Sequence, residues 1–219
     1  MPKIELIPVV ELPRADGALN AVGPLPGGSW HTHPRDWERY HSGIATASGY
    51  GRLDAFPPGS GLYPIAQFSM SDLNRLVELH LSDVQIEDSC ALFGGYVLVE
   101  SGRPIMVPQC CGTLADTVTW EAIARPEKFE EHFCLEGHPS PVAISDGNVV
   151  EIRCFDEYEP FEEPAPKSYR MNRELLCMAL NDARSTLAQV SRRLDALNSR
   201  KAGVGLSRVL IPRSEAKGC

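Results

Sequence analysis

Alternating apolar and polar residues predict strands at the start and in the middle of the chain. Residues 4–10 alternate in this way and predict one strand. Residues 90–112 and 141–155 each hold two apolar runs around a turn sequence, Ser-Gly-Arg-Pro in the first and Asp-Gly in the second. Each of these segments predicts a β-hairpin. Together the strands predict a mainly antiparallel sheet and, with the helices below, an α+β fold.

Apolar residues at spacings of three and four predict two helices in the middle of the chain. The first covers residues 69–81, with Ser71 as its N-cap. The second begins at Thr113, which with Asp116 has the spacing of a capping box, and ends before Pro126. Both helices would pack an apolar face on the predicted sheet.

The longest periodic pattern predicts a C-terminal amphipathic helix of about 28 residues. Asn172 is placed to cap its start and Gly203 to end it. Its apolar stripe has two interpretations: packing on the protein's own sheet, or pairing with a second copy in a homodimer through residues 172–202. The stripe consists of Leu176, Leu180, Ala183, Leu187, Val190, Leu194 and Leu197.

Composition divides the chain into an acidic α+β body at 1–155 with a Gly/Pro-rich loop region at 13–64, an acidic Pro-rich linker at 156–166, and a basic helix and tail at 167–219. Residues 1–166 hold 10 Lys and Arg against 25 Asp and Glu, a net charge of −15, and residues 167–219 hold 11 against 4, or +7. An acidic body repels phosphates, so we expect no direct nucleic-acid binding by the body and a basic protein partner.

The N-terminal segment lacks the features of an export signal. Lys3, Glu5 and Glu11 interrupt its apolar stretch. No apolar run approaches the roughly 18 residues that cross a bilayer. The seven cysteines are an odd number without the spacing of a disulfide scaffold. We therefore expect a cytoplasmic protein with reduced thiols and no membrane contact.

The stretch "HTHPRDWERYHS" resembles the zinc-binding signature of the JAMM metallopeptidases, which cleave isopeptide bonds. The resemblance implies that His31 and His33 are zinc ligands. Ala45, however, stands where that family has its third ligand. Catalytic zinc normally has three protein ligands, so a metal site here needs a substitute carboxylate such as Asp36 or Asp54.

The same stretch also predicts a short capped helix. Thr32 or His33 can cap it, Pro34 stands near its first position, and Gly43 can end it. The aromatic residues between them would pack against the body. We favour this interpretation because it requires no missing ligand.

A second candidate site consists of cysteines and histidines from two neighbouring segments. Cys110 and Cys111 lie between a predicted strand and a predicted helix, where backbone N–H groups and the helix dipole stabilise a thiolate. His132, Cys134 and His138 follow downstream. These five residues admit a zinc site, a Cys–His nucleophile pair, or packed cysteines without chemistry.

Residues 94–141 resemble small acidic immunity proteins of bacterial polymorphic-toxin systems, through a strand followed by Pro-Gln-Cys-Cys-Gly and a Trp-Glu helix. The resemblance implies a non-enzymatic protein that binds a toxin and blocks its active site. An acidic protein would associate rapidly with a basic toxin. The carboxylates expected to contact the partner are Asp156, Glu157, Glu159, Glu162 and Glu163.

The chain contains no P-loop, dinucleotide fingerprint or G-x-S-x-G elbow, so we expect no nucleotide cofactor. We favour a non-enzymatic binding protein without a cofactor, in the specific form of an immunity protein. One alternative is a metal- or thiol-dependent hydrolase that uses His31 and His33, with zinc, or the Cys110 and Cys111 cluster. The other is a helix-mediated homodimeric structural protein.

Overall fold

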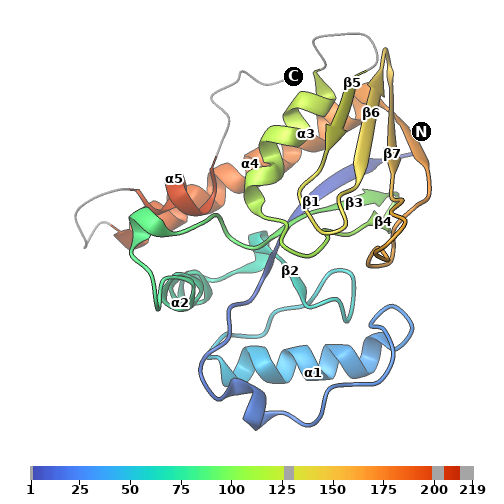
Figure 1. Cartoon of the computed structure of the whole chain (residues 1–219). Coiled ribbons are helices and arrows are strands. Elements are labelled where there is room, and N and C mark those ends of the chain that lie inside the picture. The colour runs from blue at the N-terminus through green and yellow to red at the C-terminus, as the bar shows by residue number, and fades with distance from the viewer. Residues whose placement is uncertain (1, 126–130, 199–204, 213–219) are drawn as a thin grey trace.

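The strands pair into two four-stranded antiparallel sheets, with the orders β2–β1–β3–β4 and β5–β6–β7–β8 (Figure 1). The structure is a computed structural model that describes residues 2–125, 131–198 and 205–212. Its sheets and helices confirm the predicted α+β fold and both hairpins. In chain order the elements are β1 (Ile4–Glu11), η1 (Ala18–Ala21), α1 (Pro34–Ala47), β2 (Leu62–Pro64), η2 (Ile65–Gln67), α2 (Met70–His80), η3 (Ile86–Asp88), β3 (Gly94–Glu100), β4 (Arg103–Met106), η4 (Leu114–Asp116), α3 (Thr117–Ala124), β5 (Glu131–Cys134), β6 (Val142–Asp146), β7 (Val149–Arg153), β8 (Tyr169–Asn172), α4 (Arg173–Asn198) and α5 (Leu206–Leu210).

β1 is an inner strand of the first sheet, and both of its faces are covered. It pairs with β2 on one side and β3 on the other. Side chains alternate between the faces of a strand, so Ile4 and Leu6 join the main core while Val9 joins a smaller cluster on the opposite face. Trp30, from the loop region 13–64, packs on that smaller cluster. The loop region is therefore anchored to the sheet through its own apolar side chains.

α4 covers the main-core face of β1, which agrees with the interpretation that its stripe packs on the protein's own sheet. Leu176, Leu180 and Leu194 are fully buried within the chain. Asn172 caps the helix as predicted, because its side-chain oxygen accepts the Glu174 N–H at 2.7 Å. From Leu176 to Leu194 the stripe thus packs within the protein's own core, and Leu197 is partly buried against it. Residues 199–202 and the predicted stop at Gly203 lie outside the described residues.

Two predicted helix starts are corrected by the caps that form. α2 begins after Ser69 rather than Ser71, because Ser69 and Asp72 cap each other: the Ser69 hydroxyl accepts the Asp72 N–H at 3.1 Å, and the Asp72 carboxylate accepts the Ser69 N–H at 2.9 Å. Thr113 caps a 3-10 turn through the Ala115 N–H at 3.1 Å, and α3 follows that turn. Within the described ranges no helix combines the length and apolar character needed to cross a membrane.

Residues 156–166, the acidic segment, contain no helix or strand, as expected, but their backbone is held against the body. The Glu162 N–H donates to the side-chain oxygen of Gln109 at 2.7 Å, and the Gln109 side-chain amide donates to the Glu162 carbonyl at 3.3 Å. The Val107 N–H donates to the Pro164 carbonyl at 3.3 Å. β7 and β8, on either side of the segment, are neighbours in one sheet. The segment therefore has a fixed path.

Asp116 is a buried carboxyl at the start of α3, and only 6% of the residue is exposed. Its side chain accepts the Glu136 N–H at 3.2 Å. Burial, which disfavours the charged form, raises the pKa of Asp116 to about 7, against the lowering effect of that hydrogen bond. Folding thus favours the protonated acid.

We predict that Asp116 makes the protein less stable as the pH rises from about 4 to about 7. In this window the unfolded chain ionises this carboxyl while the folded chain keeps it protonated, so stability present below pH 4 is lost as the pH passes the folded pKa. Asp116→Asn is neutral at every pH and should therefore remove this pH-dependent loss of folding stability, which is on the order of 2–4 kcal/mol. Urea unfolding at pH 4, 5.5, 7 and 8 measures this, with the exposed Asp146→Asn as control. Equal pH slopes for Asp116→Asn and wild type would contradict the prediction.

Candidate functional site

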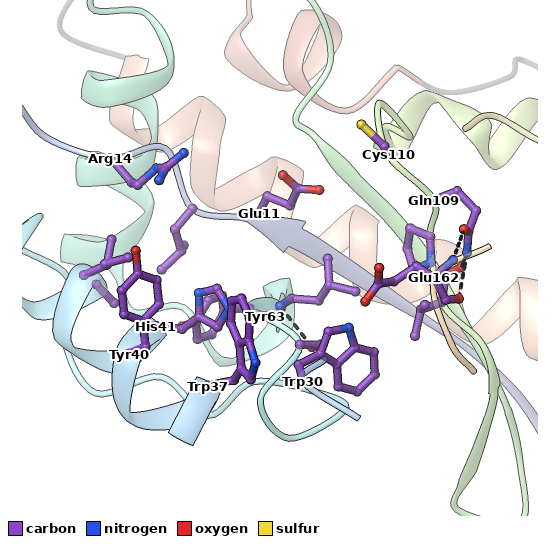
Figure 2. A pocket seen from close by; sticks show the side chains of 18 of the residues that line it. Glu11, Arg14, Trp30, Trp37, Tyr40, His41, Tyr63, Gln109, Cys110 and Glu162 are labelled. Atoms are coloured by element: carbon purple, nitrogen blue, oxygen red, sulfur yellow. Dashed lines mark hydrogen bonds between the residues drawn. The ribbon is translucent and has the colours of Figure 1, made fainter. Parts of the chain in front are cut away.

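One open cleft brings together segments that are far apart in the sequence. It has a volume of about 530 Å³ and lies where the end of β1 meets α1, the loop after β4 and the acidic segment (Figure 2). Aromatic side chains come from α1 and the loop before it, and charged or polar groups come from the other segments. The lining residues that carry the argument are Trp30, Trp37, Tyr40, His41, Glu11, Arg14, Gln109, Cys110, His138 and Glu162.

α1 supplies the aromatic wall, and its start agrees with the capped-helix prediction. Pro34 is its first residue and His33 stands at the N-cap position, although the His33 side chain makes no capping bond. The predicted stop at Gly43 is wrong, because the helix continues to Ala47. Gly43 instead permits a close approach to Val22: a Cβ at position 43 would lie 2.6 Å from a Val22 methyl carbon.

Trp37, Tyr40 and His41 form one aromatic face of α1 toward the cleft. The rings of Trp37 and His41 stack with their centroids 5.4 Å apart, and Tyr40 meets Trp37 edge-on at 5.9 Å. Residues three and four positions apart share one face of a helix, so this cluster follows directly from the sequence spacing. We did not identify it from the sequence, although the spacing Trp-x-x-Tyr-His is the signal that could have revealed it.

His41 is half-buried in this wall. Burial, and to a lesser extent the positive charge of Arg14, lowers the pKa of His41 below its ordinary value. Gly61 lies against the imidazole: a Cβ there would be 2.9 Å from its Cε1 atom. The loop that carries Gly61 is tied to α1, because the Gly59 N–H donates to the Glu38 carboxylate at 2.7 Å.

His31 and His33 are exposed and take up separate local contacts. The Nδ1 atom of His33 is 2.8 Å from the Thr32 hydroxyl, and the ring of His31 meets Trp30 edge-on. Among residues 2–125, 131–198 and 205–212, no three His, Cys, Asp or Glu side chains are grouped to hold a metal ion. The hypothesis of a zinc site at His31 and His33 therefore gains no third ligand from the described residues.

Two carboxylates line the cleft, and they come from different segments of the chain. Glu11 is the last residue of β1. Desolvation of its carboxylate disfavours the charged form and raises the pKa of Glu11, and the positive charge of Arg14 has a smaller, lowering effect on that pKa. Glu162 reaches the cleft from the acidic segment, where the double hydrogen bond to Gln109 fixes its backbone. Figure 2 shows both carboxylates on the side of the cleft that faces the aromatic wall.

Of the five cysteines and histidines predicted as a cluster, only part is brought together. Cys110 and Cys111 are adjacent, with their sulfur atoms 3.5 Å apart, and the His138 N–H donates to the Cys110 carbonyl at 2.9 Å. The imidazole of His138 lies 3.4 Å from the Glu159 carboxylate rather than in contact with a thiol. His132 and Cys134 are exposed on β5 and do not line the cleft.

No Cys–His pair forms between Cys110 and His138, because the His138 imidazole lies beside Glu159. The hydrogen-bonded contact with Cys111 raises the pKa of Cys110. The predicted stabilisation of a thiolate by a helix N-terminus is absent at Cys110. The 3-10 turn η4 lies between Cys110 and α3, and within η4 the Ala115 N–H donates to the Thr113 side chain.

Comparisons with protein-family models, curated proteins and solved structures find no match. The site must therefore be interpreted from its own geometry. That geometry is an open cleft with an aromatic wall and two carboxylates, bordered by an acidic segment of fixed path. It is suited to hold a cationic group, since aromatic faces and carboxylates both attract positive charge.

We predict that Gly61→Ala displaces His41. The new methyl group would collide with the imidazole, and the ring should move toward solvent, so the pKa of His41 should rise toward its ordinary value of about 6.5. NMR titration of the His41 Hε1 signal measures this change. Because position 61 has a φ of 73°, the substitution should also cost about 1–2 kcal/mol of stability.

Gly17→Ala is the matched control for this substitution. Gly17 has a similar φ of 75° but no atom near its Cβ position, so it carries the same backbone cost without touching His41. The control should be destabilised and leave the His41 titration unchanged. An unchanged titration in Gly61→Ala as well would show that the close packing of His41 is not the cause of its lowered pKa.

Proposed function

We propose that the protein is a non-enzymatic cytoplasmic binding protein whose acidic segment and adjoining cleft take a basic surface of a protein partner. The observation that carries the proposal is the pattern of exposure along residues 155–163. Phe155 is 72% exposed and Tyr158 is 90% exposed. The carboxylates around them are also exposed, namely Asp156, Glu157, Glu159, Glu162 and Glu163.

Exposed aromatic residues within a charged border are typical of a protein-binding surface. Aromatic side chains contribute much of the affinity at interfaces, and surrounding charges set the association rate and the choice of partner. Phe155 and Tyr158 serve as the apolar anchors in this proposal. The carboxylates then select a partner of positive charge.

The segment is preorganised for binding, which supports the same function. The Asp156 carboxylate accepts the N–H groups of Tyr158 and Glu159 at 2.8 and 3.0 Å, and these bonds lower the pKa of Asp156. Glu162 is held by Gln109. Ordering a loop on binding costs free energy, so a segment already held in place binds more tightly than a free linker of the same composition.

In this proposal the cleft next to the segment binds one long cationic side chain of the partner. Trp37 and Tyr40 offer ring faces for a guanidinium or ammonium group, and Glu11 and Glu162 offer opposite charge. The specific form of the proposal is an immunity protein that occupies the phosphate-binding surface of a basic toxin. The acidic net charge of residues 1–166 and the resemblance of residues 94–141 support this form.

Binding of a labelled arginine-rich peptide, measured by fluorescence anisotropy, tests the proposal. We expect binding that weakens as salt rises, because charge attraction is screened, and no binding of a glutamate-rich peptide of the same length. The double variant Tyr158→Ala/Glu162→Gln should bind about tenfold more weakly, the loss expected for one anchor and one charge.

Met178→Ala/Glu174→Gln is the matched control. It removes one exposed apolar side chain and one exposed carboxylate from α4, away from the cleft. This control should bind as wild type does. Equal losses in the two double variants would mean that only the overall charge matters and would overturn the proposed surface.

The immunity form has a separate test. The product of the neighbouring gene, expressed alone in a bacterial host, should arrest growth, and co-expression with this chain should restore growth. Tyr158→Ala/Glu162→Gln should restore it less than the α4 control. If the product of the neighbouring gene does not arrest growth, the immunity form is contradicted. The peptide-binding experiment then tests the general binding function separately.

A further inference from the structure

Cys110 and Cys111 occupy the two central positions of a β-turn. The Gly112 N–H donates to the Gln109 carbonyl at 3.1 Å and closes the turn. Cys111 has a φ of 66°, the left-handed conformation found at the third residue of a type II turn. The turn is fixed from outside by the His138 N–H, which donates to the Cys110 carbonyl at 2.9 Å. The backbone that carries both thiols is therefore held in place.

The turn presents both thiols to solvent and close to each other. Their sulfur atoms are 3.5 Å apart, and both residues are exposed. Disulfide formation needs a further approach of about 1.5 Å, which side-chain rotation and a small adjustment of the turn can supply. The buried Cys154, by contrast, is shielded from any soluble reagent.

We propose that Cys110 and Cys111 form a reversible dithiol–disulfide site whose oxidant is a low-molecular-mass disulfide of the glutathione class. One cysteine thiolate attacks a sulfur atom of that disulfide, forms a mixed disulfide and releases one small thiol. The second cysteine then attacks the protein sulfur of the mixed disulfide. The Cys110–Cys111 bond forms and the second small thiol leaves, so the two protein thiols are oxidised and one external disulfide is reduced to two thiols.

The geometry also makes the site reversible. Adjacent residues joined by a trans peptide have Cα atoms about 3.8 Å apart. Relaxed disulfides span Cα distances of roughly 4.4–6.8 Å, so a bond between neighbours is strained. Strained and exposed disulfides are the ones most readily reduced. Gln109, the first residue of this turn, also accepts the Glu162 N–H at 2.7 Å, so the site lies beside the backbone of the acidic segment.

Mass spectrometry of the reduced full-length chain after exposure to glutathione disulfide tests the proposal. Free thiols are blocked with N-ethylmaleimide before digestion. We expect an intramolecular bond that lowers the mass of the peptide with Cys110 and Cys111 by about 2 Da and leaves both residues unblocked, whereas Cys90 and Cys134 carry either glutathione or the blocking group. Dithiothreitol should reverse the bond fully. Cys110→Ser and Cys111→Ser should each retain glutathione on the remaining thiol, because the second attack is lost.

Cys134→Ser is the matched control, since it removes an exposed thiol outside the turn and should leave the bond intact. Three outcomes would overturn the proposal: stable glutathione on Cys110 or Cys111 in the wild type, a bond between either residue and another cysteine, or an unmodified pair under conditions that glutathionylate Cys134. The measurement uses no binding partner, so it stands or falls separately from the proposed binding function.

Discussion

The packing of apolar side chains on both faces of β1 is the constraint on which the rest of the structure depends. On one face Leu6 joins the core beneath α4, and on the other Val9 meets Trp30 of the loop region. Burial of apolar surface is the main stabilising contribution to folding, so a strand covered on two sides holds two layers together. Figure 1 shows α1 and its loops lying at the end of the molecule away from the second sheet. The cleft lies at the end of this same strand, where Glu11 lines it together with residues of α1 and of the loop after β4.

Much of the fold could be predicted because its signals are local. The stripe from Leu176 to Leu194 has the period of a helix, and Asp146-Gly147 indicates the second hairpin, although the strand register places the two-residue turn one position later, at Gly147-Asn148. The errors fall at element ends, where neighbouring residues compete. Ser69 caps α2 instead of Ser71 because Asp72 completes a reciprocal cap only with Ser69. Gly43 does not end α1 because its missing side chain serves a tertiary contact.

The site could be predicted only in part, because its residues meet through tertiary packing. Cys110 and Glu162 were predicted for different roles, yet both line one cleft, since Gln109 ties the acidic segment to the turn. Spacing in the sequence carries no information about such a contact between distant segments. Within the JAMM-like stretch, the side chains that line the cleft are those of Trp37, Tyr40 and His41 rather than those of His31 and His33.

Some charged side chains of the protein form ion pairs within the fold, whereas the carboxylates of the acidic segment have no cationic Lys or Arg partner among the described residues. Glu121 of α3 is buried and lies 3.4 Å from Arg184 of α4, so a carboxylate of the body meets a cation of the basic part inside the fold. The carboxylates of the acidic segment have no Lys or Arg at ion-pair distance within the described residues, and Glu159 lies 3.4 Å from the imidazole of His138. Crowding like charges on a held backbone opposes folding through their mutual repulsion. A partner that brings cations to this segment would relieve the repulsion, which is why our proposal places partner binding on the acidic segment rather than on the basic helix.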